Sequence, residues 1–150
     1  MKIAIGSDEN TTQTEFIVNY LSKAGYKIRL FGSLDSQKEP WSKTAKKVAE
    51  DVFTGVSEEA ILLCWTGTGV CIAANKVPKI RAALCCDAET ARGARLWNDA
   101  NVLCLSLRKT TKSVAKEILD AWFETSYEPN IEDDKCIEQI QKLEQKYFMF

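Results

Sequence analysis

Apolar residues recur along the chain in two alternating patterns: short continuous runs, and longer stretches with helical spacing. The runs fall at residues 2–6, 27–31, 61–64, 80–85 and 101–105, and each has the length and composition of a buried β-strand. In the stretches between them, apolar residues return every three or four positions, as on the buried face of a helix. The pattern therefore predicts five strands that alternate with helices.

The boundaries of these helices carry recognisable signals. Thr-Gln-Thr-Glu at residues 12–15 forms a capping box ahead of the first helix. Ser42 opens the second helix, and Asp87 is a suitable N-cap for the helix that precedes the last strand. A helix over residues 111–123 completes the unit. Because such alternation implies right-handed crossovers, we predict an α/β fold: a doubly wound, Rossmann-like, five-stranded parallel sheet with helices on both faces.

The pattern changes after residue 127. Glu-Pro-Asn at residues 128–130 breaks it, and residues 133–147 then form an amphipathic helix that begins with acidic residues and ends with lysines. We therefore divide the chain into a domain of residues 1–127 and a C-terminal helical segment of residues 128–150. This extra helix would pack either on its own domain or on a second subunit, and the sequence favours neither arrangement.

Composition and charge narrow the classes of function. A chain of 150 residues can bury a core without covalent staples. Its 20 Lys and Arg residues balance 21 Asp and Glu residues, so no electrostatic bias favours nucleic acid or an anionic membrane. The N-terminus reaches Asp8 too early for a signal-peptide core, and no apolar run reaches about 18 residues. We expect a cytoplasmic protein that binds neither nucleic acid nor membranes.

Most of the six cysteines fall inside apolar strand or helix patterns, and we expect them to be buried free thiols and not disulfides. The chain has no histidine, and no C-x-x-C pair occurs, so we predict no metal site. The Cys85-Cys86 pair is interpreted as a strand end with one thiol on each face, in preference to a redox element. Cys64 is the exception, because it lies at a turn with distinctive chemistry.

Residues 60–76 hold the most specific candidate chemistry. A buried strand ends at Cys64, the loop Thr-Gly-Thr-Gly of residues 66–69 follows, and a short helix comes next. The two glycines let the main chain turn its N–H groups toward an anion, and a thiol that faces such a helix start is favoured as the thiolate. In doubly wound sheets, ligands bind beyond the carboxyl ends of the strands, which would bring Asp8 close to Cys64.

A thiolate in this position could act as a nucleophile or as a base. Nucleophilic cysteine hydrolases need a histidine partner, which this chain lacks. A base next to a carbonyl needs only a thiolate within reach and donors for the enediolate, such as Thr66 and the amides of residues 67–69. That is the chemistry of aldose–ketose isomerisation. The loop lacks the P-loop lysine and the full dinucleotide spacing, and taken alone it could be a simple turn.

Several sequence blocks occur in order between residues 2 and 122. They are Lys-Ile-Ala-Ile-Gly-Ser-Asp, Ile-Leu-Leu-Cys-x-Thr-Gly-Thr-Gly, Ile-Ala-Ala-Asn-Lys-Val-Pro, Ile-Arg-Ala-Ala-Leu-Cys, Asn-Asp-Ala-Asn-Val-Leu and Ala-Lys-Glu-Ile-Leu-Asp-Ala-Trp. Together they resemble the ribose-5-phosphate isomerase B / galactose-6-phosphate isomerase family of sugar-phosphate isomerases. The resemblance implies the same fold and a cofactor-free isomerase acting on a sugar phosphate of the ribose-5-phosphate/ribulose-5-phosphate type.

The resemblance also implies roles for the matching residues. Cys64 would be the base that moves a proton between C1 and C2, and Thr66 would assist at the enediolate. Asp8 and Asn98 would hold sugar hydroxyls, and Arg108 would contact the phosphate. Family members are dimers whose sites borrow residues from the partner, so a homodimer or tetramer with shared sites is implied. The candidate substrate-binding residues are Asp8, Glu9, Trp65, Gly67, Thr68, Gly69, Trp97, Asn98 and Arg108.

Four departures from the family pattern concern the substrate. Glu9 and Trp97 stand where the family has histidines, Trp65 replaces a glycine, and the acidic run 129–134 replaces a segment with arginines. Trp cannot exchange a proton to open a sugar ring, and Glu9 would repel a phosphate dianion. A linear or unphosphorylated sugar is therefore an alternative substrate, and a sugar-binding relative that does not catalyse is an alternative function. A thiol redox protein acting through Cys64 or Cys71 ranks third.

Two pairs of residues have open assignments. Trp65 and Trp97 would either border the site and stack on an apolar sugar face or fill the core or a dimer interface. Arg92 and Arg95 could replace the missing cations, although a solvated helix face is the preferred interpretation.

Overall fold

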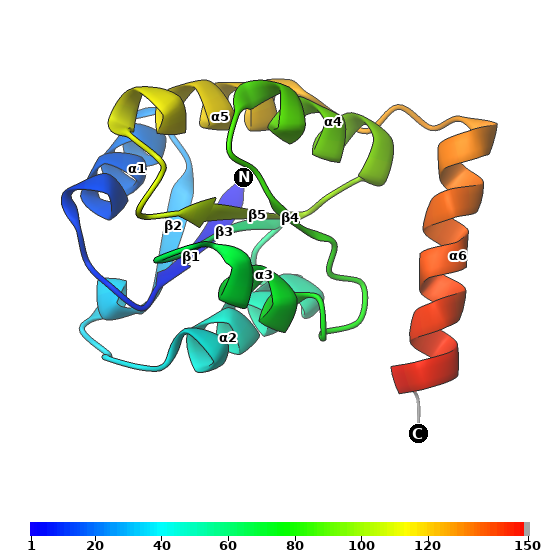
Figure 1. The fold of residues 1–150 in the computed structure, drawn as a ribbon, viewed down its shortest axis with the longest axis horizontal. Helices are drawn as coiled ribbons and strands as arrows, with labels where there is room; N and C mark the ends of the chain where they lie inside the picture. The colour runs from blue at the N-terminus through cyan, green and yellow to red at the C-terminus, as the bar shows by residue number, and fades with distance from the viewer. Residues whose placement is uncertain (149–150) are drawn as a thin grey trace.

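The computed structural model describes residues 1–148 and shows the predicted doubly wound α/β fold (Figure 1). One five-stranded sheet has the order β2-β1-β3-β5-β4, and every neighbouring pair of strands is parallel. The strands are β1 (Lys2–Ser7), β2 (Lys27–Gly32), β3 (Glu59–Cys64), β4 (Ala82–Leu84) and β5 (Val102–Ser106). The helices are α1 (Thr12–Lys23), α2 (Trp41–Phe53), α3 (Thr68–Ala74), α4 (Ala88–Asn98), α5 (Lys112–Glu124) and α6 (Ile131–Phe148), with a 3-10 turn η1 (Ser33–Asp35) after β2.

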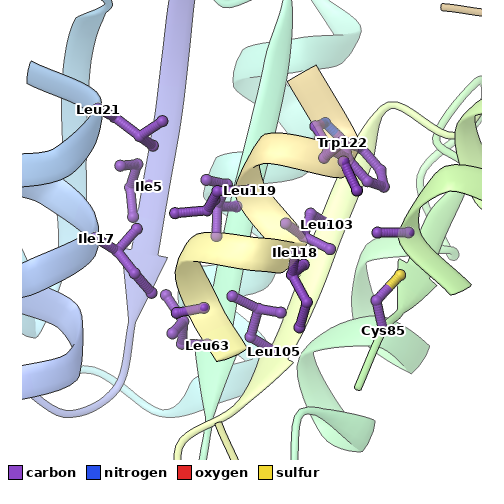
Figure 2. Packing of buried hydrophobic residues seen from close by; sticks show 14 of the residues in the cluster. Ile5, Ile17, Leu21, Leu63, Cys85, Leu103, Leu105, Ile118, Leu119 and Trp122 are labelled. Atoms are coloured by element: carbon purple, nitrogen blue, oxygen red, sulfur yellow. The ribbon is translucent and has the colours of Figure 1, made fainter. Parts of the chain in front are cut away.

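Helices cover both faces of the sheet, and each face has its own apolar core. Figure 1 shows α1, α4 and α5 on one side and α2 and α3 on the other. The first core joins the sheet residues Ile5, Leu63 and Leu105 to helical residues such as Ile118 and Trp122 (Figure 2). The second core lies under α2 and α3 and contains the following side chains: Ala4, Ala45, Val48, Leu62, Cys64, Val70 and Cys104. The predicted inward face of the 111–123 helix is confirmed by the burial of Ile118, Leu119 and Trp122.

The strand order reverses between β1 and β3, as doubly wound connectivity requires. From β1 the chain moves outward to β2 and then returns across β1 to form β3. The register pairs Ser7 with Leu63, and Cys64 with Ser106. Asp8 therefore follows the end of β1 beside the end of β3 at Cys64, which confirms the predicted neighbourhood of these two loops.

Several predicted boundaries differ from the structure by a few residues. The capping box belongs to Thr11 and Thr14, whose hydroxyls accept each other's main-chain N–H, because Thr12 is already in the helix. The second helix starts at Trp41 rather than Ser42. The fourth strand is shorter than predicted, since the N–H of Arg81 donates to the side chain of Asn101 instead of joining the ladder. The prediction of Asp87 as an N-cap is confirmed, because its side chain accepts a hydrogen bond from the Thr90 N–H at 2.7 Å.

Helix α6 stands apart from the sheet beyond the β4 edge, at the end of an extended linker (Figure 1). Its Glu144 carboxylate accepts the Lys79 N–H at 3.1 Å from each oxygen. A cavity of about 490 Å³ lies between α6 and the body of the domain, and Ile140 and Leu143 remain exposed. Within residues 1–148, no helix combines the length and the apolar character needed to cross a membrane.

Candidate functional site

Cys64 ends β3 at the carboxyl edge of the sheet and is only 5% exposed. Its side chain belongs to the core under α2 and α3, together with Val70 and Cys104. The ladder continues past the strand end, because Leu107 donates its N–H to the Cys64 carbonyl oxygen at 2.9 Å. The main chain of Cys64 is thus fixed, and its side chain is buried, at the point where the loop to α3 begins.

The loop after Cys64 turns in a conformation that favours glycine. Gly67 has φ +76, and an added Cβ would lie 2.6 Å from the Leu84 side chain and 2.9 Å from the Leu105 carbonyl group. The hydroxyls of Thr66 and Thr68 are exposed and share a hydrogen bond of 2.7 Å. The loop therefore presents two hydroxyl groups at its surface. Its turn at Gly67 leaves no room for a side chain.

Asp8 and Glu9 follow β1 directly beside Cys64. The Asp8 side chain is half-buried, and its Oδ1 atom is buried without a hydrogen-bond partner among residues 1–148. Burial raises the pKa of Asp8 above its usual value, and the nearby charge of Glu9 raises this pKa further, against a main-chain hydrogen bond that lowers it. The Ser33 hydroxyl fixes this segment by donating to the Asp8 carbonyl oxygen at 2.7 Å. Glu9 is exposed, so the site has one partly covered carboxylate with an unused oxygen and one open carboxylate.

Trp65 and Arg108 lie on this same edge. The Trp65 carbonyl oxygen accepts hydrogen bonds from the Arg108 N–H at 3.0 Å and from the Ser106 hydroxyl at 2.9 Å. The Trp65 indole is 58% exposed, which excludes the interpretation that it fills the core of its own chain. The Arg108 side chain is exposed as well, so both groups can reach a ligand at this edge.

Trp97 and Asn98, in contrast, lie at the opposite edge of the sheet within one chain. They end α4, which returns from the carboxyl end of β4 to the amino end of β5. The Asn98 carbonyl oxygen accepts from the Arg81 side chain, just before β4 starts. The length of a five-residue strand, about 17 Å, therefore separates this edge from Cys64. One chain does not bring these two residues to the candidate site.

The proposed replacement of the missing cations by Arg92 and Arg95 is not supported. Arg95 lies 2.7 Å from Glu59 at the amino edge of β3, and its side chain is 13% exposed, so it is also not on a solvated helix face. Arg92 pairs with Glu89 on the surface of α4. Neither arginine is free to bind an anion next to Cys64.

The other cysteines are free thiols, as predicted, but Cys86 and Cys136 are exposed, so the expected burial is wrong for these two. Cys85 is buried and Cys86 is exposed, and both follow the end of β4 at Leu84, so the two neighbouring thiols lie in different environments. A hydrogen bond with Cys104 lowers the pKa of the half-buried Cys71 to about 7, and burial raises that of Cys85 to about 12. Within residues 1–148, no three His, Cys, Asp or Glu side chains are grouped so that they could hold a metal ion.

Trp41 is a neighbour of the loop that the sequence pattern did not identify. It is the first residue of α2, and three of its ring atoms lie 3.0–3.2 Å from the place that a Cβ on Gly69 would occupy. A tryptophan at a helix start carries no local signal of this contact, because it depends on how α2 packs against α3.

Comparisons with known proteins identify the family of this chain. The family model described as Ribose/Galactose Isomerase matches residues 3–140. The D-erythrulose-4-phosphate isomerase of Pectobacterium atrosepticum is 36% identical over 130 residues, which are 85% of this chain and 86% of the relative. The ribose-5-phosphate isomerase B of Escherichia coli is 35% identical over 146 residues, 97% of each chain.

A solved structure is similar along nearly the whole chain. The ribose-5-phosphate isomerase B of Clostridium thermocellum has a TM-score of 0.91 and 37% identity, and the match covers 98% of this chain and 99% of the other. Sequence blocks, family model and fold therefore lead to one assignment. The chain belongs to the ribose/galactose isomerase family.

Proposed function

We propose that this protein is an aldose–ketose isomerase that acts on a sugar phosphate through Cys64 as the base. The observation that carries the proposal is the adjacency of three elements at the carboxyl edge of β1 and β3. These are the buried thiol of Cys64, the Gly67 turn with its two threonine hydroxyls, and Asp8 with its unpartnered carboxylate oxygen. Membership of the family supports the same chemistry.

In the proposed reaction, the Cys64 thiolate takes the proton from C2 of the aldose. The electron pair of that C–H bond forms the C1–C2 double bond, and the carbonyl oxygen at C1 becomes the enediolate oxygen. Thr66 and the amides of residues 67–69 hold this charge. The thiol then returns the proton to C1, the hydroxyl proton passes from O2 to O1, and C2 becomes the carbonyl of the ketose. Asp8 accepts hydrogen bonds from sugar hydroxyls.

The composition of the site favours a substrate that is already open. The chain has no histidine to exchange protons during ring opening near neutral pH. An aldotetrose 4-phosphate cannot close a five-membered ring, because its C4 oxygen carries the phosphate. One of the similar proteins is named for such a four-carbon substrate. We therefore place tetrose 4-phosphates ahead of ribose 5-phosphate as substrates, with Arg108 as the cation for the phosphate.

A complete site requires a second subunit in this proposal. Trp97 and Asn98 match substrate-binding positions of the family, yet they end α4 at the far edge from Cys64. A homodimer in which α4 of one subunit reaches the Cys64 edge of the other would supply them. The exposed indoles of Trp65 and Trp97 would then line a shared site.

Hydrogen exchange with solvent tests the chemistry directly. The purified protein is incubated in D₂O with erythrose 4-phosphate, ribose 5-phosphate or galactose 6-phosphate, and deuterium in the sugar is followed by NMR. We expect exchange with at least the tetrose, loss of exchange in Cys64→Ala, and unchanged exchange in Cys136→Ala, whose thiol is exposed on α6. Saturable sugar binding without exchange, equal in the wild type and Cys64→Ala, would show a binding protein instead.

A further inference from the structure

The thiols of Cys71 and Cys104 meet in the second core, and the proposed reaction uses neither of them. Cys71 lies on α3 and Cys104 in β5, and α3 packs against this strand. Cys104 is fully buried, Cys71 is half-buried, and their side chains share a hydrogen bond in which the Cys104 thiol donates. Two sulfurs from elements distant in the sequence are thus already neighbours, which is a precondition for a disulfide bond.

Further hydrogen-bond donors surround the Cys71 sulfur. The side-chain amide of Asn75, one turn further along α3, lies 3.6 Å from it, and the main-chain N–H of Leu84 in β4 donates to it as well. The Cys104 thiol lowers the pKa of Cys71 most, against burial, and together with Leu84 and Asn75 it brings this pKa to about 7. A large share of Cys71 is therefore thiolate near neutral pH, and the thiolate is the form that reacts with oxidants.

Asn75 fixes the position of this group of donors. Its side-chain oxygen accepts the Ala82 N–H at 2.9 Å, and its side-chain nitrogen donates to the Ala82 carbonyl oxygen at 2.9 Å. The end of α3 is thereby bound to the edge strand β4. The surroundings of the Cys71 sulfur are built by one helix and two strands and not by a surface loop.

We propose that Cys71 is an oxidation site for hydroperoxides and that Cys104 is its resolving thiol, so that the two form a reversible disulfide. In the first step the Cys71 thiolate attacks a peroxide oxygen, the O–O bond breaks, and hydroxide leaves, which gives a sulfenic acid on Cys71. In the second step the Cys104 sulfur attacks the Cys71 sulfur and the S–O bond breaks. Water leaves with the Cys104 proton, and a dithiol reverses the oxidation by thiol–disulfide exchange.

The disulfide would act on the loop that precedes α3. Bond formation shortens the distance between the two sulfurs, so α3 must move toward β5. Helix α3 begins directly after Gly67, and the turn at Gly67 already leaves no room beside the Leu105 carbonyl group. The loop of residues 66–69 would therefore be displaced, and oxidation should lower the isomerase activity reversibly. This consequence, unlike the disulfide itself, rests on the proposed function.

Peptide mapping after peroxide treatment tests for the disulfide. The purified protein is exposed to hydrogen peroxide, free thiols are blocked with iodoacetamide, and the digest is analysed by mass spectrometry. Trypsin leaves Cys64 and Cys71 together in the peptide of residues 48–76, so chymotrypsin must also cut after Trp65 to tell them apart. We expect a peptide pair that joins Cys71 to Cys104 and that disappears with dithiothreitol.

Variants separate the two steps. Cys104→Ala should stop at the sulfenic acid, which dimedone then labels at Cys71. Cys136→Ala is the matched control, because it removes an exposed thiol on α6, and it should form the same disulfide as the wild type. In assays of activity, peroxide should inactivate the wild type reversibly, whereas Cys71→Ser should keep its activity over the same exposure.

The absence of the Cys71–Cys104 pair in oxidised, folded wild type would overturn the proposal, and so would a disulfide from Cys71 to a different cysteine. An equal loss of activity in Cys71→Ser would show that peroxide acts through another group such as Cys64, and the switch would be abandoned. If Cys104→Ala does not fold by circular dichroism, the wild-type map and Cys71→Ser decide the question. The disulfide is detected without substrate, so a protein that forms it but converts no sugar phosphate would contradict the isomerase proposal alone.

Discussion

The guanidinium of Arg95 lies 2.7 Å from the carboxylate of Glu59, and the two side chains are 13% and 12% exposed. The same carboxylate accepts a hydrogen bond from the Trp122 indole N–H at 2.7 Å. Arg95 also donates to the carbonyl oxygens of Ala100 and Thr125. This cluster ties α4 and α5 to the start of β3, at the edge of the sheet remote from Cys64.

Arg95→Met should therefore destabilise the protein strongly, by roughly 3–5 kcal/mol, because it leaves the Glu59 carboxylate buried without its cation. Urea denaturation followed by circular dichroism measures the loss. The double variant Glu59→Gln/Arg95→Met should recover much of it, since no buried charge remains. Arg92→Met, which breaks the surface pair with Glu89, should show no measurable change, and a loss as large as that of Arg95→Met would contradict this account.

The Glu59 carboxylate should make the free energy of unfolding depend on pH, and the sign of this dependence follows from its pKa shift. Burial raises the pKa of Glu59 above 4.5, although Arg95 and the Trp122 hydrogen bond lower it in part. The folded state thus holds this proton more tightly than the unfolded chain does. The resulting stabilisation is complete below the ordinary carboxyl range and is lost as the pH rises through the raised pKa. Relative to Glu59→Gln, the wild type should lose stability over that interval, and a pH-independent difference in urea midpoints would refute the assignment.

The fold could be predicted because its signals are local. Continuous apolar runs such as residues 61–64 have few alternatives to a buried parallel strand, and the order of elements then fixes the crossovers. Boundaries were harder, since Thr11 and Thr12 are chemically identical caps and only the main-chain conformation of Thr11 distinguishes them. The shortened fourth strand depends on the hydrogen bond that the Asn101 side-chain oxygen accepts from the Arg81 N–H, which no local pattern reveals.

The candidate site was only partly predictable. The adjacency of Asp8 and Cys64 follows from the switch in strand order between β1 and β3, which is implied by the doubly wound fold that the sequence pattern predicts. The connectivity also implies that a residue at the end of α4, such as Trp97, lies at the amino edge, so its separation from Cys64 within one chain could have been deduced. The Trp41 contact could not, because it depends on the packing of two helices whose starting points are distant in the sequence.

Gly67 and Gly25 form a matched pair for testing the loop. Both have positive φ, +76 and +91, but a Cβ on Gly67 would collide with Leu84 and Leu105, whereas nothing lies within 4 Å at Gly25. Gly67→Ala should destabilise the protein by about 2 kcal/mol or more and abolish isotope exchange. Gly25→Ala should cost about 1 kcal/mol, from its left-handed backbone alone, and retain exchange. Equal losses of stability would show that steric contact in the loop is unimportant.

The thiols of Cys71 and Cys85 should differ sharply in reactivity. With a pKa of about 7, Cys71 should be alkylated by iodoacetamide at a rate that rises through neutral pH, whereas Cys85, with a pKa of about 12, should stay unmodified. Mass spectrometry of peptides measures both sites. Cys104→Ala removes the main cause of the lowered pKa and should move the Cys71 midpoint upward. A midpoint near 8.5, typical of a free thiol, in the wild type would contradict this prediction.

Mixing inactive variants tests whether the site is shared between subunits. In the proposed dimer, each site combines Cys64 of one subunit with Asn98 of the other, so Cys64→Ala and Asn98→Ala are each inactive alone. A mixed dimer has one site in which both residues are intact. Equal mixing, with dissociation and reassembly, should therefore restore about a quarter of the wild-type activity, because half of the dimers are mixed and each has one of two sites.

The matched control for this experiment pairs Cys64→Ala with Thr66→Ala. These residues lie two positions apart in one loop. In a mixed dimer, one loop therefore carries Cys64→Ala and the other carries Thr66→Ala. In that mixture each site takes its whole loop from one subunit, and no wild-type site forms. Restored activity with Asn98→Ala but not with Thr66→Ala would place α4 of the second subunit at the Cys64 edge. No restoration in either mixture would mean that Asn98 takes no part in catalysis across the interface, and the shared-site proposal would be abandoned.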